Sequence, residues 1–135
     1  MKISKYCAAA LLFLALTTVG LNAAQKEDGT MTKLGDGSYV VNTTTLAKDV
    51  KGYRGPIPLK LTIKNDKLEK IEVLKNQETP KYLARVKSEY IPKWLGIKVA
   101  KASKLNPDGV TGATLSSNAI KENIKRGLEY YKTHK

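Results

Sequence analysis

The sequence contains almost no cysteine or histidine. Its one cysteine, Cys7, lies near the N-terminus, and its one histidine, His134, is the second residue from the other end. Without the N-terminal segment the chain has no thiol, which excludes disulfides, iron–sulfur clusters and thiol catalysis. A single histidine without cysteine also provides too few ligands for a transition-metal site, so we expect no metal and interpret His134 as a tail residue.

The sequence also lacks an apolar run of the length that crosses a membrane. Lys2 and Lys5 precede an uncharged stretch over residues 6–24, of which only residues 7–16 are densely apolar, whereas a spanning helix needs about 20 apolar residues. A basic start, a short apolar centre and small residues at a cleavage point are typical of a secretory signal. We therefore expect residues 1–24 to be a cleaved signal peptide and the protein to be exported. The alternative is an uncleaved membrane anchor.

Acidic residues are scarce as well. The chain has 12 Asp and Glu against 24 Lys and Arg, a formal net charge of +12. Such an excess of positive charge attracts nucleic acid, anionic lipid or acidic proteins. Export argues against nucleic acid, and the lysines are spread along the chain rather than gathered in one block. Two interpretations stay open, a solvated basic surface and a surface that steers the protein toward an anionic partner or membrane.

The chain beyond the signal segment is long enough for one domain with a modest core. Residues 25–37 are polar and include three glycines, Gly29, Gly35 and Gly37. Such a composition is typical of a poorly ordered terminus. We therefore predict a flexible N-terminal arm over residues 25–37 and a single domain over residues 38–135.

Alternating apolar and polar residues predict an antiparallel hairpin. Leu59, Leu61 and Ile63 alternate with polar residues, and residues 68–74 repeat the pattern after a tight reversal at residues 65–67. A period of two is the signature of a strand with one buried face. The two runs therefore form neighbouring strands of a sheet.

Shorter patterns complete the predicted fold. Residues 38–46 favour a strand, and residues 52–56 favour a turn. Residues 97–105 are the least clear segment, and we expect a short strand there. Residues 80–90 and 116–132 have apolar positions at helical spacing. The predicted fold class is α+β, a small antiparallel sheet with helices packed on one face.

Residues 108–117 read Asp-Gly-Val-Thr-Gly-Ala-Thr-Leu-Ser-Ser and lead into the C-terminal helix. Gly112 and Ala113 let the backbone approach a ligand closely, and the free amides of a helix start favour an anion such as a phosphate. Plain capping of the helix by Ser or Thr is the alternative that the residues leave open. The segment is neither a Walker loop nor a dinucleotide fingerprint, because neither glycine spacing is present. Four hydroxyls surround the same point: Thr111, Thr114, Ser116 and Ser117.

Residues 108–116 closely resemble the flavinylation motif of the FMN-binding domain family. That pattern is Asp, two variable residues, Ser or Thr, then Gly-Ala-Thr, a variable residue and Ser. The family includes peripheral subunits of sodium-pumping quinone reductases and related electron-transport complexes, and small secreted flavoproteins. The resemblance implies that a bacterial flavin transferase, using FAD, attaches FMN through a phosphodiester to the last threonine of Gly-Ala-Thr, which is Thr114 here.

The resemblance continues upstream, from about residue 38 to residue 131. A Gly52-Tyr53 turn, paired strands and a Glu78-Thr79-Pro segment follow the family's order. Two departures stand out. Many members continue Glu-Thr-Pro with Gly-Leu-Gly, whereas this chain has Lys-Tyr-Leu, and Gly109 occupies a position where alanine is common.

The resemblance also implies roles for individual residues. Glu78 and Thr79 are expected at the edge of the flavin ring, and Asp108 is expected either to form an Asx turn or to be recognised by the flavin transferase. The residues expected to hold the phosphate are Thr111, Gly112, Ala113, Ser116 and Ser117. Four aromatic residues are candidates to stack on the flavin or to belong to the core: Tyr53, Tyr82, Tyr90 and Trp94.

Three functions are compatible with this reading. The leading prediction is an exported electron carrier, on the periplasmic or extracellular side of a bacterial membrane, between a membrane redox complex and an acceptor such as an extracytoplasmic reductase. The second is a small flavin-dependent reductase of quinones or metal complexes. The third is a basic docking module that uses the fold without flavin.

Overall fold

The computed structural model describes residues 29–135, so the predicted signal peptide and the first residues of the predicted arm lie outside the described residues. Five strands form one antiparallel sheet in the order of the chain. They are β3 (Met31–Lys33), β4 (Tyr39–Asn42), β5 (Leu59–Lys64), β6 (Lys67–Val73) and β7 (Ile97–Lys98). The helical elements are α3 (Pro80–Glu89), the 3-10 helix η3 (Ile91–Trp94), α4 (Val99–Ala102) and α5 (Thr114–His134).

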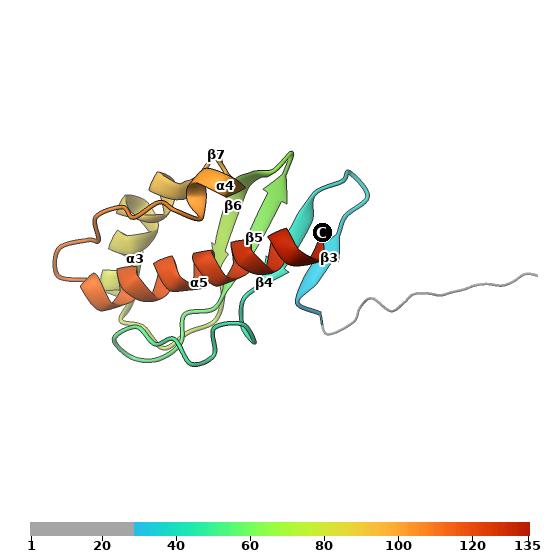
Figure 1. Ribbon diagram of the computed structural model, residues 1–135. Helices are drawn as coiled ribbons and strands as arrows, with labels where there is room; N and C mark the ends of the chain where they lie inside the picture. The colour runs from blue at the N-terminus through green and yellow to red at the C-terminus, as the bar shows by residue number, and fades with distance from the viewer. Residues whose placement is uncertain (1–28) are drawn as a thin grey trace, which may run out of the picture.

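The helices lie on one side of this sheet. Figure 1 shows α5 running across the sheet face, with α3 beside the start of α5 and α4 beside the strands. The predicted α+β class, a small antiparallel sheet with helices on one face, is confirmed. No helix within residues 29–135 has the length and apolar character needed to span a bilayer.

The central hairpin agrees with the prediction. Leu59, Leu61 and Ile63 of β5 are fully buried while the residues between them are partly exposed. The reversal is made by Asn65 and Asp66, both with positive φ, at 53° and 62°. Two successive positive φ values are the geometry of the type I′ turn, which matches the twist of paired strands and suits Asn and Asp.

The prediction of a flexible arm over residues 25–37 is wrong for the part that the structure describes. Met31–Lys33 forms the edge strand β3 and pairs with β4, with Met31 opposite Val41. Two of the three glycines that suggested flexibility, Gly35 and Gly37, lie in the turn between β3 and β4, where Gly37 has a φ of +89° and Asp36 accepts hydrogen bonds from Ser38. The folded domain therefore begins before residue 38.

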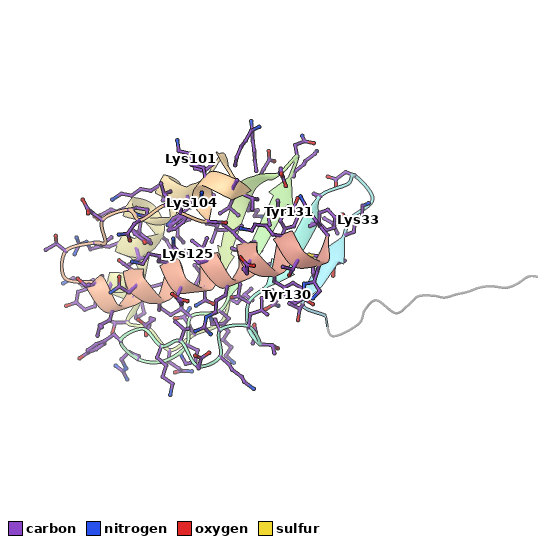
Figure 2. All side chains as sticks on the ribbon, in the orientation of Figure 1. Lys33, Lys101, Lys104, Lys125, Tyr130 and Tyr131 are labelled. Carbon is purple, nitrogen blue, oxygen red and sulfur yellow. The ribbon has the colours of Figure 1, made fainter. Side chains whose placement is uncertain are left out.

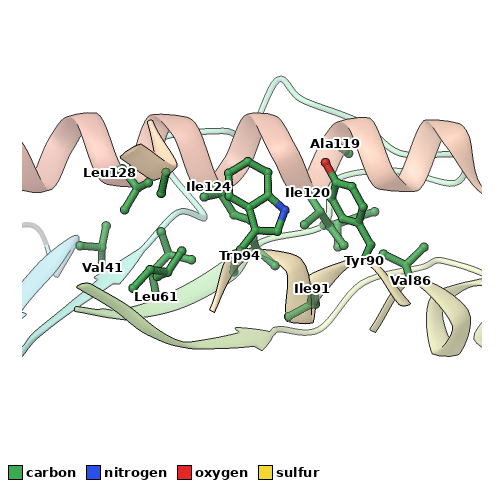
Figure 3. Close-up of a cluster of buried hydrophobic side chains, with 14 of the residues drawn as sticks. Val41, Leu61, Val86, Tyr90, Ile91, Trp94, Ala119, Ile120, Ile124 and Leu128 are labelled. Atoms are coloured by element: carbon green, nitrogen blue, oxygen red, sulfur yellow. The ribbon is translucent and has the colours of Figure 1, made fainter. Parts of the chain in front are cut away.

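Helix α5 closes the core over the sheet. Its predicted apolar stripe is buried, and Figure 3 shows Leu128 above Val41 and Leu61 of the strands, with Ile124 beside Trp94 and Ile120 beside Tyr90. Gly127 allows this close approach, because a Cβ atom there would lie 2.5 Å from Cδ1 of Leu61 and 3.1 Å from Cγ2 of Thr43. Elsewhere on the stripe, the larger side chains occupy the space between helix and strands.

Three element boundaries differ from the prediction. The strand expected over residues 38–46 ends at Asn42, whose side chain accepts hydrogen bonds from the amide and hydroxyl of Thr44 and so begins a turn. The segment 97–105 holds only two strand residues before α4. The C-terminal helix begins at Thr114, two residues earlier than predicted.

Candidate functional site

A cavity of about 440 Å³ lies at the N-terminal end of α5. Three segments that are far apart in the sequence form it, namely the turn after residue 52, the start of α3 and the loop that enters α5. Its lining residues are Tyr53, Glu78, Thr79, Tyr82, Gly112, Ala113, Thr114, Leu115 and Ser116. The volume lies within the range of about 300–1,000 Å³ that is usual for small-molecule sites.

Thr114 is the first residue of α5 and is exposed at this cavity. The residue before it, Ala113, occupies the N-cap position, and no side chain caps the helix. The first amide bonded within the helix is that of Ser117, which donates to the carbonyl of Ala113 at 3.0 Å. The amides of residues 114–116 therefore have no acceptor inside the helix, which is the usual source of anion binding at a helix start.

Gly112 makes this entry into the helix possible. Its φ is +85°, a conformation that costs a residue with a Cβ roughly 1–2 kcal/mol. The turn it makes leads the chain from the exposed Thr111 to the buried Ala113. Capping by Ser or Thr, the alternative left open by the sequence, is not what the structure shows.

Glu78 holds two walls of the cavity together. Its carboxylate is buried and accepts hydrogen bonds from the backbone amides of Tyr53, at 3.1 Å, and Arg54, at 2.6 Å. The hydroxyl of Ser116 also donates to this carboxylate. Glu78 thus links the 52–56 turn to the first turn of α5, a positioning contact that the sequence did not predict.

The glycine of the Gly-Tyr turn has a steric reason. A Cβ atom on Gly52 would lie 2.8 Å from Oε1 of Glu78 and 2.6 Å from Cδ1 of Ile57. The turn closes through a 2.7 Å hydrogen bond from the amide of Gly52 to the carbonyl of Gly55. Only a residue without a side chain lets the turn come this close to the buried carboxylate.

Ser117 does not reach the cavity, contrary to the prediction that it holds the phosphate. Its side chain is fully buried, and the residue does not line the cavity. The hydroxyl donates to the carbonyl of Ala113 at 2.9 Å and accepts from the amide of Val110 at 3.1 Å. Ser117 therefore shapes the loop rather than contacting a ligand, because its hydroxyl already satisfies two backbone groups.

Two cations, which sequence reasoning missed, hold the loop before α5. Arg85 of α3 donates from Nη1 to the carbonyl oxygen of Thr111 at 2.9 Å, and Lys93 donates from Nζ to that of Asp108 at 3.1 Å. Basic residues on exposed helix positions carry no sequence signal for such contacts. The Asp108 carboxylate itself belongs to an exposed residue outside the cavity lining.

The four aromatic candidates divide into two pairs. Tyr53 and Tyr82 line the cavity and are 68% and 39% exposed. Tyr90 and Trp94 are buried in the core, where their rings meet edge to face at 6.1 Å (Figure 3). Burial raises the pKa of Tyr90. Only the first pair is placed to meet a ligand.

His134 lies at the far end of α5 from the cavity, where its ring stacks on Tyr130 at 3.8 Å. Among residues 29–135, no three Asp, Glu, Cys or His side chains gather closely enough to hold a metal ion. The groups that the cavity offers to a ligand are the hydroxyls of Thr79 and Thr114, the amides at the start of α5 and the two tyrosines.

A comparison with known protein families gave a match. Residues 52–129 match the family model of the FMN-binding domain, a range that covers more than half of the chain. The protein belongs to the FMN-binding domain family. Its cofactor is FMN. The matched range contains all three segments that line the cavity. No solved structure matches the chain.

The residues of the cavity suit the two ends of FMN. The unbonded amides at the start of α5 are suited to a phosphate, and the exposed aromatic faces of Tyr53 and Tyr82 are suited to a flat ring. The family match confirms the FMN-binding family that the sequence indicated.

Proposed function

We propose that this FMN-binding domain carries its cofactor covalently on Thr114 and transfers electrons outside the cytoplasm, between a membrane redox complex and an acceptor. The observation that carries the proposal is the position of Thr114. It is exposed at the first residue of α5, inside the cavity, next to amides without an intrahelical acceptor. A hydroxyl there is accessible to a flavin transferase and adjacent to the groups that stabilise a phosphate.

The proposed attachment of FMN to Thr114 is a phosphoryl transfer from FAD. The oxygen of Thr114 forms a bond to the FMN phosphorus, the pyrophosphate bond of FAD breaks, AMP leaves, and the hydroxyl proton passes to solvent. The exposed Asp108 lies outside the cavity lining, which supports its proposed role as a recognition point for the transferase rather than a ligand to the phosphate.

The product carries one negative charge, which the chain is equipped to stabilise. The start of a helix acts like roughly half a positive charge, at about 0.3–1 kcal/mol for an adjacent anion. Arg85 adds a cation beside the loop, at the carbonyl of Thr111. The hydroxyl of Ser116 is already donated to Glu78, so the backbone amides are the principal donors to the phosphate.

FMN, when bound, supplies the redox chemistry, and the protein supplies orientation and surroundings. Tyr53 and Tyr82 offer aromatic surface for the ring, and Thr79 offers a hydroxyl at the same wall. Electron transfer demands no proton donor, in agreement with a cavity whose one carboxylate, Glu78, is engaged by two amides and a hydroxyl.

The sequence supports export through the basic residues Lys2 and Lys5 and the short apolar segment after them. Covalent attachment keeps the cofactor on a protein that has left the cytoplasm, where free FMN would be lost by dilution. The two parts of the proposal therefore support each other.

Intact-mass spectrometry of protein co-expressed with a flavin transferase tests the attachment. We expect a mass gain of one FMN less one water, lost in Thr114→Ala. The matched control is Thr133→Ala, which removes a hydroxyl from an exposed threonine near the other end of α5 and is expected to leave the gain in place. A gain that survives in Thr114→Ala, or its absence from the parent protein beside an active transferase, contradicts covalent attachment at Thr114.

A further inference from the structure

The mouth of the cavity combines exposed apolar side chains with cations. Among residues 29–135, five large hydrophobic side chains are exposed, and three of them, Tyr53, Tyr82 and Leu115, line this one cavity. Contiguous exposed apolar surface rimmed by polar groups marks sites of interaction. The concentration at the mouth is therefore a property of this site and not of the surface as a whole.

Three cations border the same mouth. Arg54 follows Tyr53 in the turn and is exposed, Lys81 places its Nζ 6.0 Å from the ring centre of Tyr82, and Arg85 contacts the carbonyl of Thr111. The side chains of Arg54 and Lys81 form no salt bridge within the described part of the chain. Arg85 pairs with the exposed Glu89 at 3.2 Å, and Glu78, the one carboxylate that lines the cavity, is buried. Arg54 and Lys81 therefore give the mouth its solvent-facing positive charge.

Resting on the proposed electron-transfer function, we propose that this rim, made of Tyr53, Arg54, Lys81, Tyr82, Arg85 and Leu115, docks an acidic surface of the redox partner protein. A fully reduced FMN, when bound, would supply two electrons, enough for two one-electron acceptors in succession, with its protons passing to water. Complementary charge raises the rate of such encounters and fixes their orientation. The apolar residues at the centre exclude water where the two cofactors approach.

The size of the rim favours a protein over a lipid surface. Lipid recognition by charge uses clusters of about 4–8 Lys and Arg, more than the three cations present here. Weak redox encounters, in contrast, bury less than about 1,200 Å² in total and depend on steering. A concave mouth with three cations and an apolar centre suits the second kind of contact.

The test needs a probe that is acidic and redox-active, and a copper protein with an acidic surface, an acidic cupredoxin, serves. Amide NMR of the protein purified without FMN, titrated with this cupredoxin at low salt, is expected to show shifts concentrated at residues 53–55, 81–85 and 114–116 and abolished by high salt. Because this titration does not need flavin, it tests the docking surface independently of the proposed FMN attachment.

A variant pair completes the test. In Arg54→Gln/Lys81→Gln the NMR shifts are expected to disappear, and reduction of the cupredoxin by the FMN-loaded protein is expected to slow about tenfold at low salt. The matched control is Lys101→Gln/Lys104→Gln, an equal loss of charge at exposed residues of α4 and of the turn that follows it (Figure 2), for which we expect less than a twofold effect. A basic c-type cytochrome serves as the acceptor of opposite charge, and its reduction is expected not to slow in the rim variant.

Two results would overturn the proposal. Shifts spread over the whole surface, or equal losses in the two variants, would mean that the overall positive charge alone attracts the probe. Co-sedimentation with vesicles of phosphatidylcholine and phosphatidylglycerol that is lost only in the rim variant would assign the rim to an anionic membrane instead.

Discussion

At the scale of single residues, the cavity depends on side chains that contact backbone. Glu78 accepts two backbone amides and one hydroxyl, Arg85 donates to a carbonyl of the loop before α5, and Ser117 bridges two backbone groups of that loop. The partners of Glu78 are 24 to 38 residues away from it in the sequence. The geometry of the site is thus set by polar residues beneath it.

Replacing Glu78 by alanine tests this role. The change leaves two backbone amides and a hydroxyl without their acceptor, and we expect it to lower the free energy of unfolding by about 2–3 kcal/mol. Urea unfolding of the protein without FMN measures the loss. The control Glu69→Ala removes an exposed carboxylate from β6 and is expected to change stability by no more than about 0.5 kcal/mol. Equal stability of the two variants would show that Glu78 does not hold the walls together.

The sequence predicted the residue types at the site better than their roles. Glu78 was expected at the edge of the flavin ring and Ser117 at the phosphate. In the structure the Glu78 carboxylate accepts hydrogen bonds that position the 52–56 turn, and the Ser117 side chain is buried. Tyr53 and Trp94 were equal candidates for stacking, and only burial separates them. A side chain's partners depend on which segments fold against it, which a linear pattern does not contain.

At the scale of elements, α5 is the part that connects core and site. Its middle packs on β4 and β5, its first residue is Thr114, and its last turns meet the β5–β6 hairpin. Anything that lifts the helix from the sheet therefore moves Thr114 relative to Glu78 and Tyr53.

Gly127→Val tests how closely α5 approaches the sheet. The added atoms would overlap the buried Leu61, since even a Cβ alone would lie 2.5 Å from its Cδ1. We expect a loss of about 2 kcal/mol, because overpacking of a core typically costs about 1–3 kcal/mol and the gain in helix propensity from glycine to valine is only a few tenths of a kcal/mol. Urea unfolding compares this variant with Lys132→Val at an exposed position of the same helix. A neutral Gly127→Val would mean that the helix and sheet separate easily.

The contact between Tyr131 and Asp66 makes stability depend on pH. The Tyr131 hydroxyl donates to Oδ1 of Asp66 at 2.7 Å. Burial, followed by the hydrogen bond and charge of Asp66, raises the pKa of Tyr131 to about 12, and the same hydrogen bond lowers the pKa of Asp66. The raised tyrosine pKa stabilises the fold fully below the unfolded value of about 10, and this contribution is lost as pH rises toward 12.

Tyr131→Phe is therefore expected to lower stability at neutral pH by about 1 kcal/mol and to differ less from the parent protein above pH of about 10. On the acid side the difference also shrinks as pH falls through the depressed pKa of Asp66, because the protonated carboxyl accepts more weakly. Urea unfolding over a pH series measures the stability difference at both the acid and the alkaline end, with Tyr53→Phe as the exposed control. A difference that stays constant with pH would show that the hydrogen bond does not contribute.

At the scale of the whole molecule, positive charge exceeds negative charge two to one, with 24 Lys and Arg against 12 Asp and Glu. The salt bridges of the described residues lie on the surface, where each contributes little. Repulsion among the remaining cations therefore opposes the compact state.

Added salt is consequently expected to stabilise the protein. Screening shortens the range of repulsion from about 30 Å at 0.01 M salt to about 10 Å at 0.1 M, so the urea midpoint should rise between these conditions. Sodium sulfate is avoided, since it strengthens apolar burial independently of charge. A midpoint that falls with sodium chloride would show that the surface ion pairs outweigh the repulsion.

The sequence alone determined the features that depend on local pattern. The alternation of Leu59, Leu61 and Ile63, the Asn-Asp reversal and the stripe of α5 follow from side-chain periodicity and turn preference. The motif around Thr114 identified the family without any coordinates. Those features depend on residues within one turn or one strand of each other.

Only the tertiary structure decided the rest, because it depends on contacts between distant segments. Met31–Lys33 is too short and polar to indicate a strand by itself, and it becomes one only beside β4. The cavity exists because Glu78 and Ser116 meet across 38 residues of chain, and Arg85 reaches the loop across 26. Such contacts form when apolar faces pack against each other, and that packing assigns each polar residue its partner.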